Sequence, residues 1–156
     1  MVQPSQPSEN EKRAGALLVK KIETGAIPEI EQIISAAEYP KDMPIKNGMT
    51  ALMVAASEGS KDALTVIIQH TPNINIQDQT GRTALHYACQ GAKQENVELL
   101  LQHPNIDKDC RTNGGNTPLM LAVQSGDIYS VVHCLNVGCN PYLENGLHET
   151  AKSMAK

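Results

Sequence analysis

The sequence repeats itself at intervals of 33 or 34 residues, and this period constrains the fold more than any other feature. The segments 48–55, 81–88 and 115–122 are close copies of one another, each with glycine first, threonine third, leucine fifth and alanine eighth. A weaker copy places Thr150 one further period along the chain. Self-similarity at such a period indicates small units stacked in a row, because each unit alone cannot bury its apolar face.

A second pattern follows each copy in the sequence and predicts a second helix in every unit. Aliphatic or similar small residues recur there at positions i, i+3 and i+4, which places three side chains on one helical stripe. These triplets begin at Ile30, Leu64, Val97 and Val131. A glycine separates the two helices of most units, but Ala92 occupies its place in the middle unit, so we expect local backbone strain there. The pattern predicts an all-α solenoid of helix–turn–helix units.

Polar connectors join one unit to the next, and they carry strong turn signals. Asn-Gly or Thr-Gly pairs stand at 47–48, 80–81, 113–115 and 145–146. Such pairs favour tight hairpin turns, because glycine and asparagine tolerate the positive φ angles that these turns need. We therefore expect β-hairpin-like loops between the helical units.

These residues resemble the ankyrin repeat, whose units begin with a Gly-x-Thr-Pro-Leu-His-x-Ala segment, although the proline appears only at Pro118 and the histidine only at His86. The resemblance implies an all-α ankyrin-repeat solenoid whose hairpin tips and first helices line a concave face. We accordingly divide the chain into a flexible N-terminal tail and a repeat domain. The tail spans 1–12 and the domain 13–156, with capping helices at 13–46, repeats at 47–79, 80–113 and 114–145, and a C-terminal capping helix at 146–156.

Composition argues against several other classes of protein. The 13 Lys and Arg residues are outnumbered by 17 Asp and Glu, and no basic stripe stands out, so we expect no nucleic-acid partner. No apolar run is long enough to span a bilayer, and the first 15 residues lack the apolar core of a signal peptide. Four cysteines are too few for a secreted disulfide framework. We expect a protein that is located in the cytoplasm or the nucleus. We also expect it to be a monomer and not to bind a membrane.

The resemblance also indicates where a partner protein would bind. It places the residue before the repeated alanine on the concave face, which predicts an apolar stripe of Val54, Tyr87 and Leu121. Aromatic and aliphatic anchors within a polar rim are typical of binding surfaces. The predicted rim consists of Ser57, Glu58, Gln90, Gln124 and Ser125 on the helices and of Gln79, Thr80, Arg82, Asn113 and Asn116 at the tips.

The predicted function is therefore recognition of another protein through the concave face, as an adaptor or scaffold. Two alternatives remain open at this stage. One is a regulatory or chaperone-like inhibitor of an enzyme subunit, of the kinase or proteasome type. The other is a fragment of a longer ankyrin array.

Catalysis, metal binding and cofactor binding are not expected. Ser57, Asp78 and His86 fall in neighbouring units, but the repeat architecture already explains each of them. No pair of cysteines or histidines has the spacing of a zinc site. The resemblance places Asn75 where ankyrin proteins can be hydroxylated by an asparaginyl hydroxylase, although we favour a role in stabilising the hairpin.

Overall fold

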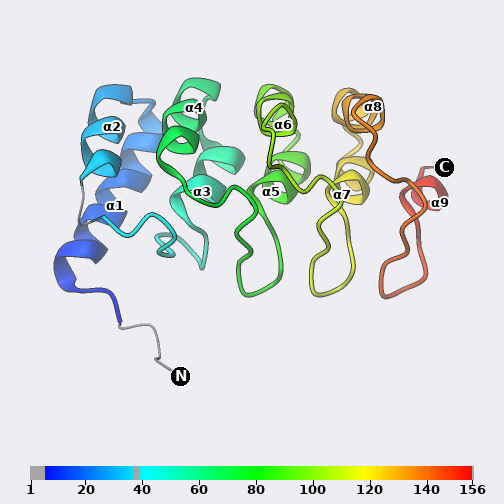
Figure 1. Cartoon of the computed structure of the whole chain (residues 1–156), viewed down its shortest axis with the longest axis horizontal. Helices are drawn as coiled ribbons and strands as arrows, with labels where there is room; N and C mark the ends of the chain where they lie inside the picture. Colours follow the sequence, from blue (N-terminus) through cyan, green and yellow to red (C-terminus); the bar gives the residue numbers. More distant parts are fainter. Residues whose placement is uncertain (1–5, 37–38, 156) are drawn as a thin grey trace.

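The described part of the chain forms two rows of helices that run side by side (Figure 1). The computed structural model describes residues 6–36 and 39–155. The lower row in Figure 1 consists of α1 (Glu9–Thr24), α3 (Ala51–Glu58), α5 (Ala84–Gln90), α7 (Pro118–Ser125) and α9 (Ala151–Met154). The upper row consists of α2 (Ile27–Ser35), α4 (Lys61–His70), α6 (Gln94–Leu101) and α8 (Ile128–Asn136). Successive helices of a row contact one another, which confirms the predicted all-α solenoid.

The repeated threonines begin the first helix of each unit. Thr50, Thr117 and Thr150 are N-cap residues whose hydroxyls accept a hydrogen bond from the backbone N–H three residues later. This bond satisfies one of the amide groups that a helix start leaves without a partner. The leucine and alanine of the repeated segment then face the core, as at Leu85 and Ala88, which are fully buried. Periodicity in the sequence thus reports both where a helix begins and which side it buries.

The second helices bury the predicted aliphatic stripe in three of the four units. Two residues of each stripe are fully buried, at i and i+3 in α4 (Leu64, Ile67) and α6 (Val97, Leu100) and at i and i+4 in α2 (Ile30, Ile34). Ile33 of α2 is only partly buried. The exception is α8, where Cys134 is buried but Leu135 is 44% exposed. The difference has a simple cause, since α8 ends the upper row of the described chain while α9 extends only the lower row (Figure 1).

Three loop tips share one compact turn. In the turns 78–82, 112–116 and 145–149 the first backbone N–H donates to the last carbonyl over 2.9 Å. The fourth residue of each turn has a positive φ, at Gly81, Gly115 and His148. The last tip forms the expected hairpin-like turn, but its positive φ lies at His148 and not at Asn145 or Gly146. Asn145 instead anchors the turn by accepting from the backbone N–H groups of Leu147 and Glu149.

The helix boundaries differ from expectation at the N-terminal end. α1 begins at Glu9, because the Ser8 hydroxyl accepts from the Glu11 N–H and the Glu11 carboxylate accepts from the Ser8 N–H. Residues 9–12 are therefore helical and do not belong to the predicted tail 1–12, while its residues 1–5 lie outside the described chain. The strain expected at Ala92 is confirmed, since its φ of 51° lies in the left-handed region.

Candidate protein-binding surface

The predicted apolar stripe does not reach the surface at two of its three positions. Val54 and Leu121 are buried, because the first helices lie against one another in the lower row. The sequence prediction was therefore wrong for these two residues, which a partner cannot touch without opening the stack. Tyr87 alone is half-exposed. A single central aromatic residue replaces the stripe.

Tyr87 is held in place by the loop tip before its own helix. Its hydroxyl donates to the Asp78 carboxylate over 2.5 Å, and the Arg82 guanidinium lies 5.7 Å from the ring centroid. Asp78 also accepts from the Thr80 hydroxyl at 2.7 Å. These contacts fix the orientation of the aromatic ring and leave part of it open to solvent. They also join three residues that a partner would meet together, an aromatic ring, a cation and an anion.

The hydrogen bonds at this cluster set its charge. Burial alone would raise the pKa of Asp78, but hydrogen bonds from Tyr87, Thr80 and Arg82 outweigh this effect and lower the pKa below its usual value. Burial raises the pKa of the Tyr87 phenol, and the neighbouring Asp78 raises it further. At neutral pH the pair therefore consists of an ionised carboxylate and a protonated phenol.

The remaining predicted residues are accessible to different degrees. Ser57, Arg82 and Asn116 are half-buried. The exposed residues are Glu58, Gln79, Thr80, Gln90, Asn113, Gln124 and Ser125. Glu58 is also bound to Lys46 at 2.6 Å, and Lys46 in turn contacts Glu23 at 2.9 Å. Apart from Glu58 and Arg82, the predicted rim carries amides and hydroxyls and no formal charge.

Neighbouring loop tips are bonded directly to one another. The Asn113 side chain donates to the Gln79 carbonyl at 2.8 Å, and its backbone N–H donates to the Thr80 carbonyl at 2.9 Å. One repeat further on, the Asn145 side chain donates to the Asn116 side chain at 3.0 Å. Part of the predicted polar rim thus connects the tips, and the surface they present is preorganised before any partner binds.

His86 also bridges two repeats. Its ring is buried, with Nδ1 accepting from the Thr83 N–H at 3.1 Å and Nε2 bonded to the Asn116 carbonyl at 3.0 Å. Because Nδ1 accepts, Nε2 carries the proton and donates it. Burial is the main cause that lowers the pKa of His86, so its neutral form is favoured in the folded chain.

Sequence reasoning missed Asp78 as part of this surface, although the period contains a signal for it. The side-chain oxygens of Asp78, Thr112 and Asn145 each accept from backbone N–H groups within their own tip. A short polar acceptor at the first residue of a turn is the mark of such turns. Comparison of the three positions would have shown that only Asp78 adds a formal charge.

Asn75 has a clear structural role in the described chain. Its amide donates to the Asn105 carbonyl at 2.7 Å, and its side-chain oxygen accepts from the Asp107 N–H at 2.8 Å. Both bonds reach the following repeat. The favoured interpretation of a hairpin-stabilising residue is supported by these contacts, and hydroxylation stays a prediction.

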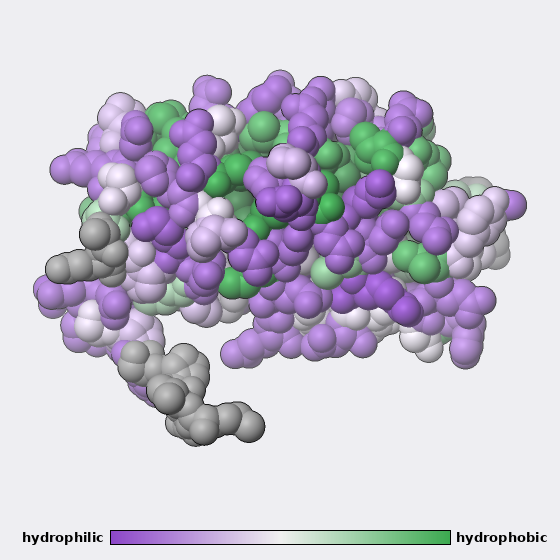
Figure 2. Space-filling view, in the orientation of Figure 1, coloured by the Kyte–Doolittle hydropathy of each residue, from purple (hydrophilic) through white to green (hydrophobic). Residues whose placement is uncertain are grey.

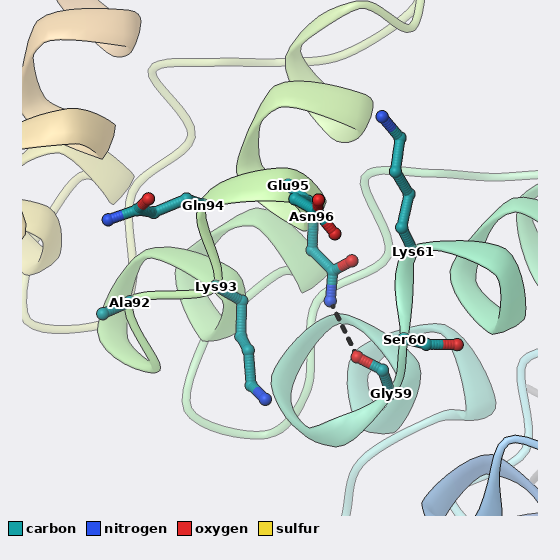
Figure 3. A pocket seen from close by; sticks show the side chains of 8 residues that line it. All are labelled: Gly59, Ser60, Lys61, Ala92, Lys93, Gln94, Glu95 and Asn96. Carbon is teal, nitrogen blue, oxygen red and sulfur yellow. Dashed lines mark hydrogen bonds between the residues drawn. The ribbon is translucent and has the colours of Figure 1, made fainter.

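A separate shallow groove lies at the turns between the helices of two repeats (Figure 3). It has a volume of about 350 Å³ and is lined by residues 59–61 and 92–96. Figure 3 shows the Asn96 amide directed at the Gly59 carbonyl, to which it donates at 3.2 Å. Because Asn96 also donates to the carbonyls of Ala55 and Ala56, its amide is occupied by the stack. The groove therefore offers a partner little beyond the exposed side chains of Lys61, Lys93 and Glu95 at its rim.

Other chemistry is sparse among residues 6–36 and 39–155. This part of the chain holds no group of three or more His, Cys, Asp or Glu side chains arranged to bind a metal ion. It also holds no helix with the length and apolar character needed to cross a bilayer. Cys89, Cys134 and Cys139 are buried free thiols. A hydrogen bond with Cys134, together with burial, raises the pKa of Cys139. A thiol in such surroundings stays protonated and unreactive.

The comparison with known proteins identifies the family. The ankyrin-repeat profile, in three copies, matches residues 17–112 and 72–145, so the chain belongs to the ankyrin-repeat family. It is 35% identical over 78 residues to Rabankyrin-5 of Mus musculus, which covers 50% of this chain and 7% of that protein. It is 32% identical over 108 residues to the neurogenic locus notch homolog protein 1 of Danio rerio, which covers 69% of this chain and 4% of that protein.

The chain thus spans less than a tenth of the length of these two relatives. Ankyrin repeats in general are protein–protein interaction modules, and the described stack has their architecture. A similarity restricted to the repeats shows that the scaffold is shared but does not identify the partner, because function depends on the particular residues placed on a fold.

Proposed function

We propose that this chain is a non-enzymatic binding module that recognises a partner protein through the surface around Tyr87. The observation that carries the proposal is the cluster of Tyr87, Arg82 and Asp78, in which hydrogen bonds hold a half-exposed aromatic ring beside a cation. Tyrosine and arginine are the residues that most often dominate the free energy of binding at protein interfaces. The cluster differs from its counterparts in the other repeats, where Val54 and Leu121 are buried.

The surroundings of the cluster suit a polar partner segment. The exposed amides of Gln79, Gln90 and Gln124 and the hydroxyl of Thr80 offer both donors and acceptors. The bonds between neighbouring tips hold the tip that carries Gln79 and Thr80 against the following tip. A segment that lies across the tips would pay little entropy for ordering them, because they are already ordered.

Affinity capture with matched variants tests this proposal. The chain and its Tyr87→Ala/Arg82→Ala double variant are immobilised, and the proteins retained from a lysate of the source organism are quantified by mass spectrometry. We expect at least a tenfold loss of the specific partner, as two anchor residues at the centre of an interface are removed. Tyr142→Ala, which removes an exposed tyrosine elsewhere, is the matched control. Identical retention by all three chains would contradict the proposal.

The same experiment separates an adaptor from a regulator. A stoichiometric enzyme subunit that loses activity when the chain is added would support an inhibitor of the kinase or proteasome type. Several unrelated partners would support an adaptor. We favour the adaptor, because the described surface combines one anchor cluster with mostly neutral polar groups.

A further inference from the structure

Helix α8 differs from the other helices of the upper row in its charge. The helices α2, α4 and α6 carry Glu29 and Glu31, Lys61 and Asp62, and Glu95 and Glu98, respectively. In contrast, α8 has the sequence IYSVVHCLN, without a single Asp, Glu, Lys or Arg. A surface helix of a soluble stack ordinarily presents charged or polar groups to solvent. The outer side of α8 therefore calls for a physical explanation.

Exposed apolar side chains concentrate on this helix. Of the seven large hydrophobic residues that are exposed in the described chain, four lie on α8, namely Ile128 at 76%, Tyr129 at 47%, Val132 at 49% and Leu135 at 44%. Figure 2 shows hydrophobic surface at the upper right, where Figure 1 places α8. An apolar groove of about 300 Å³, lined by Val123, Val131 and Leu135 among others, adjoins these residues.

The position of α8 at the end of its row explains only part of this exposure. Leu101, the counterpart of Leu135 in α6, is 8% exposed and has α8 beside it. Another helix in the row would cover Leu135 in the same way. The counterparts of Ile128 and Val132 are Gln94, which is exposed, and Glu98, which is half-exposed, although α6 has a neighbour on both sides. Ile128 and Val132 thus lie where a continued stack would leave them in water.

Ile128, Val131, Val132 and Leu135 form one stripe, with the spacing i, i+3, i+4 and i+7. The stripe is symmetric about its centre, because Ile128 and Leu135 lie equally far from the central pair of valines. A two-fold axis through that centre places the Ile128 of one helix opposite the Leu135 of an antiparallel second helix. We propose that this stripe, named the α8 stripe, is a self-association surface on which a second copy of the chain packs its own α8 antiparallel.

Electrostatics favours a second copy as the occupant. In a two-fold interface only the groups near the axis meet their own counterparts, so a formal charge at the central valines, Val131 and Val132, would oppose a like charge. α8 has none, apart from the titratable His133, which stacks beside Tyr129 at 6.1 Å between ring centroids. Antiparallel pairing also brings the positive end of each helix dipole near the negative end of the other. The stripe consists of four side chains, whereas a stable interface has about 20–30 residues per partner, so the association is weak and reversible.

Analytical ultracentrifugation of the whole chain tests the proposal. Between about 1 μM and about 1 mM, a range suited to a weak dimer, we expect the weight-average mass to rise toward twice that of one chain. Val132→Glu is expected to weaken the dimer at least tenfold, since it buries two carboxylates against each other. Leu147→Glu makes the same change in charge at an exposed leucine of the last loop tip and should leave the dimer intact. Thermal unfolding of each variant verifies that it is folded.

Two results would overturn the α8 stripe as a self-association surface. One is a chain that stays monomeric over the whole range of concentration. The other is a dimer that Val132→Glu does not weaken. An isotope-filtered NOE experiment on mixed labelled and unlabelled chains gives an independent measurement, in which Ile128 methyl groups should contact Leu135 methyl groups of the other copy. Contacts from α8 to α1 would indicate head-to-tail association and would also contradict the proposal.

Discussion

The rows of helices and the row of loop tips belong to the same repeats, but different forces hold them together. Within the helices, neighbouring units meet through buried aliphatic side chains such as Leu85, Val97 and Leu100. At the tips, they meet through directed hydrogen bonds, such as the one from Asn113 to the Gln79 carbonyl. Burial of apolar area has no preferred direction, whereas a hydrogen bond requires a particular distance and angle. The helices therefore account for most of the stability, and the tips set the geometry of the binding surface.

The largest expected effect comes from breaking the helical side of this comparison. Leu85→Ala removes a fully buried side chain from α5, which has helices on both sides. We expect the free energy of unfolding to fall by about 2–5 kcal/mol, because the substitution leaves a cavity between repeats. Urea denaturation followed by circular dichroism measures this change. Leu147→Ala at an exposed position should change stability by less than about 0.5 kcal/mol, and equal losses in both variants would contradict the burial argument.

The tip row is tested by a pair of glycine substitutions. Gly81 and Gly126 both have positive φ, but a Cβ at Gly81 would lie 2.6 Å from the Asn113 nitrogen, while one at Gly126 would meet nothing within 4 Å. Each alanine variant should lose about 1–2 kcal/mol through its backbone conformation. We expect Gly81→Ala to lose at least about 1 kcal/mol more, since it also forces two tips apart. Equal losses of unfolding free energy in the two variants, measured by urea denaturation, would show that the close contact between the tips does not contribute to stability.

His86 links the two regions, and its protonation makes their connection depend on pH. Its pKa is lowered in the folded chain, so the unfolded chain binds the proton more readily. The stabilisation is complete above the ordinary histidine value of about 6.5 and is lost as the pH falls below it, with a slope of at most about 1.4 kcal/mol per pH unit. His86→Met introduces the residue found at the equivalent Met53 and Met120. Chemical denaturation from pH 7 to 5 should show a flatter profile for this variant, and an unchanged slope would exclude His86 as the cause.

The smallest effect should be a gain of stability at the strained turn between α5 and α6. Ala92 has a φ of 51°, where an alanine Cβ is unfavourable and glycine is not. We expect Ala92→Gly to stabilise the chain by up to about 1 kcal/mol, because relief of strain exceeds the added freedom of the unfolded chain. A rise in the melting temperature measures it. A loss of stability would mean that the turn accommodates alanine without strain.

Most of the scaffold could be predicted from the sequence, because the residues that determine it recur every 33 or 34 positions. The recurring threonines, leucines and alanines identify the helix starts and the buried side of each first helix, as Thr117 and Leu119 illustrate. The strain at Ala92 was also visible, since its sister positions include glycine. These features depend on local geometry, which repeats whenever the residues do.

The candidate surface was less predictable, because exposure depends on how closely neighbouring units approach. Val54 and Leu121 occupy the same repeat position as Tyr87, yet they are buried and it is not. The smaller side chains fit between the helices, while the hydroxyl of Tyr87 reaches the Asp78 carboxylate at the edge of the stack. The exposed apolar surface of α8 was not predicted for a related reason, because Ile128 and Val132 are unusual only in comparison with their counterparts Gln94 and Glu98.

The short helix α9 has a consequence for how the molecule opens. In a linear array, each unit is held by the interfaces with its two neighbours, and a unit that lacks one of them unfolds first. α9 extends the lower row by only four residues, so α8 is held by the stack on one side. Within the described chain α8, like α2 at the other end of the row, has a neighbour in its row on one side only, and its amide protons should exchange before those of α4 and α6. Pairing of two α8 helices would give this helix a second packed side, so that dimer formation should also slow the exchange of its amide protons.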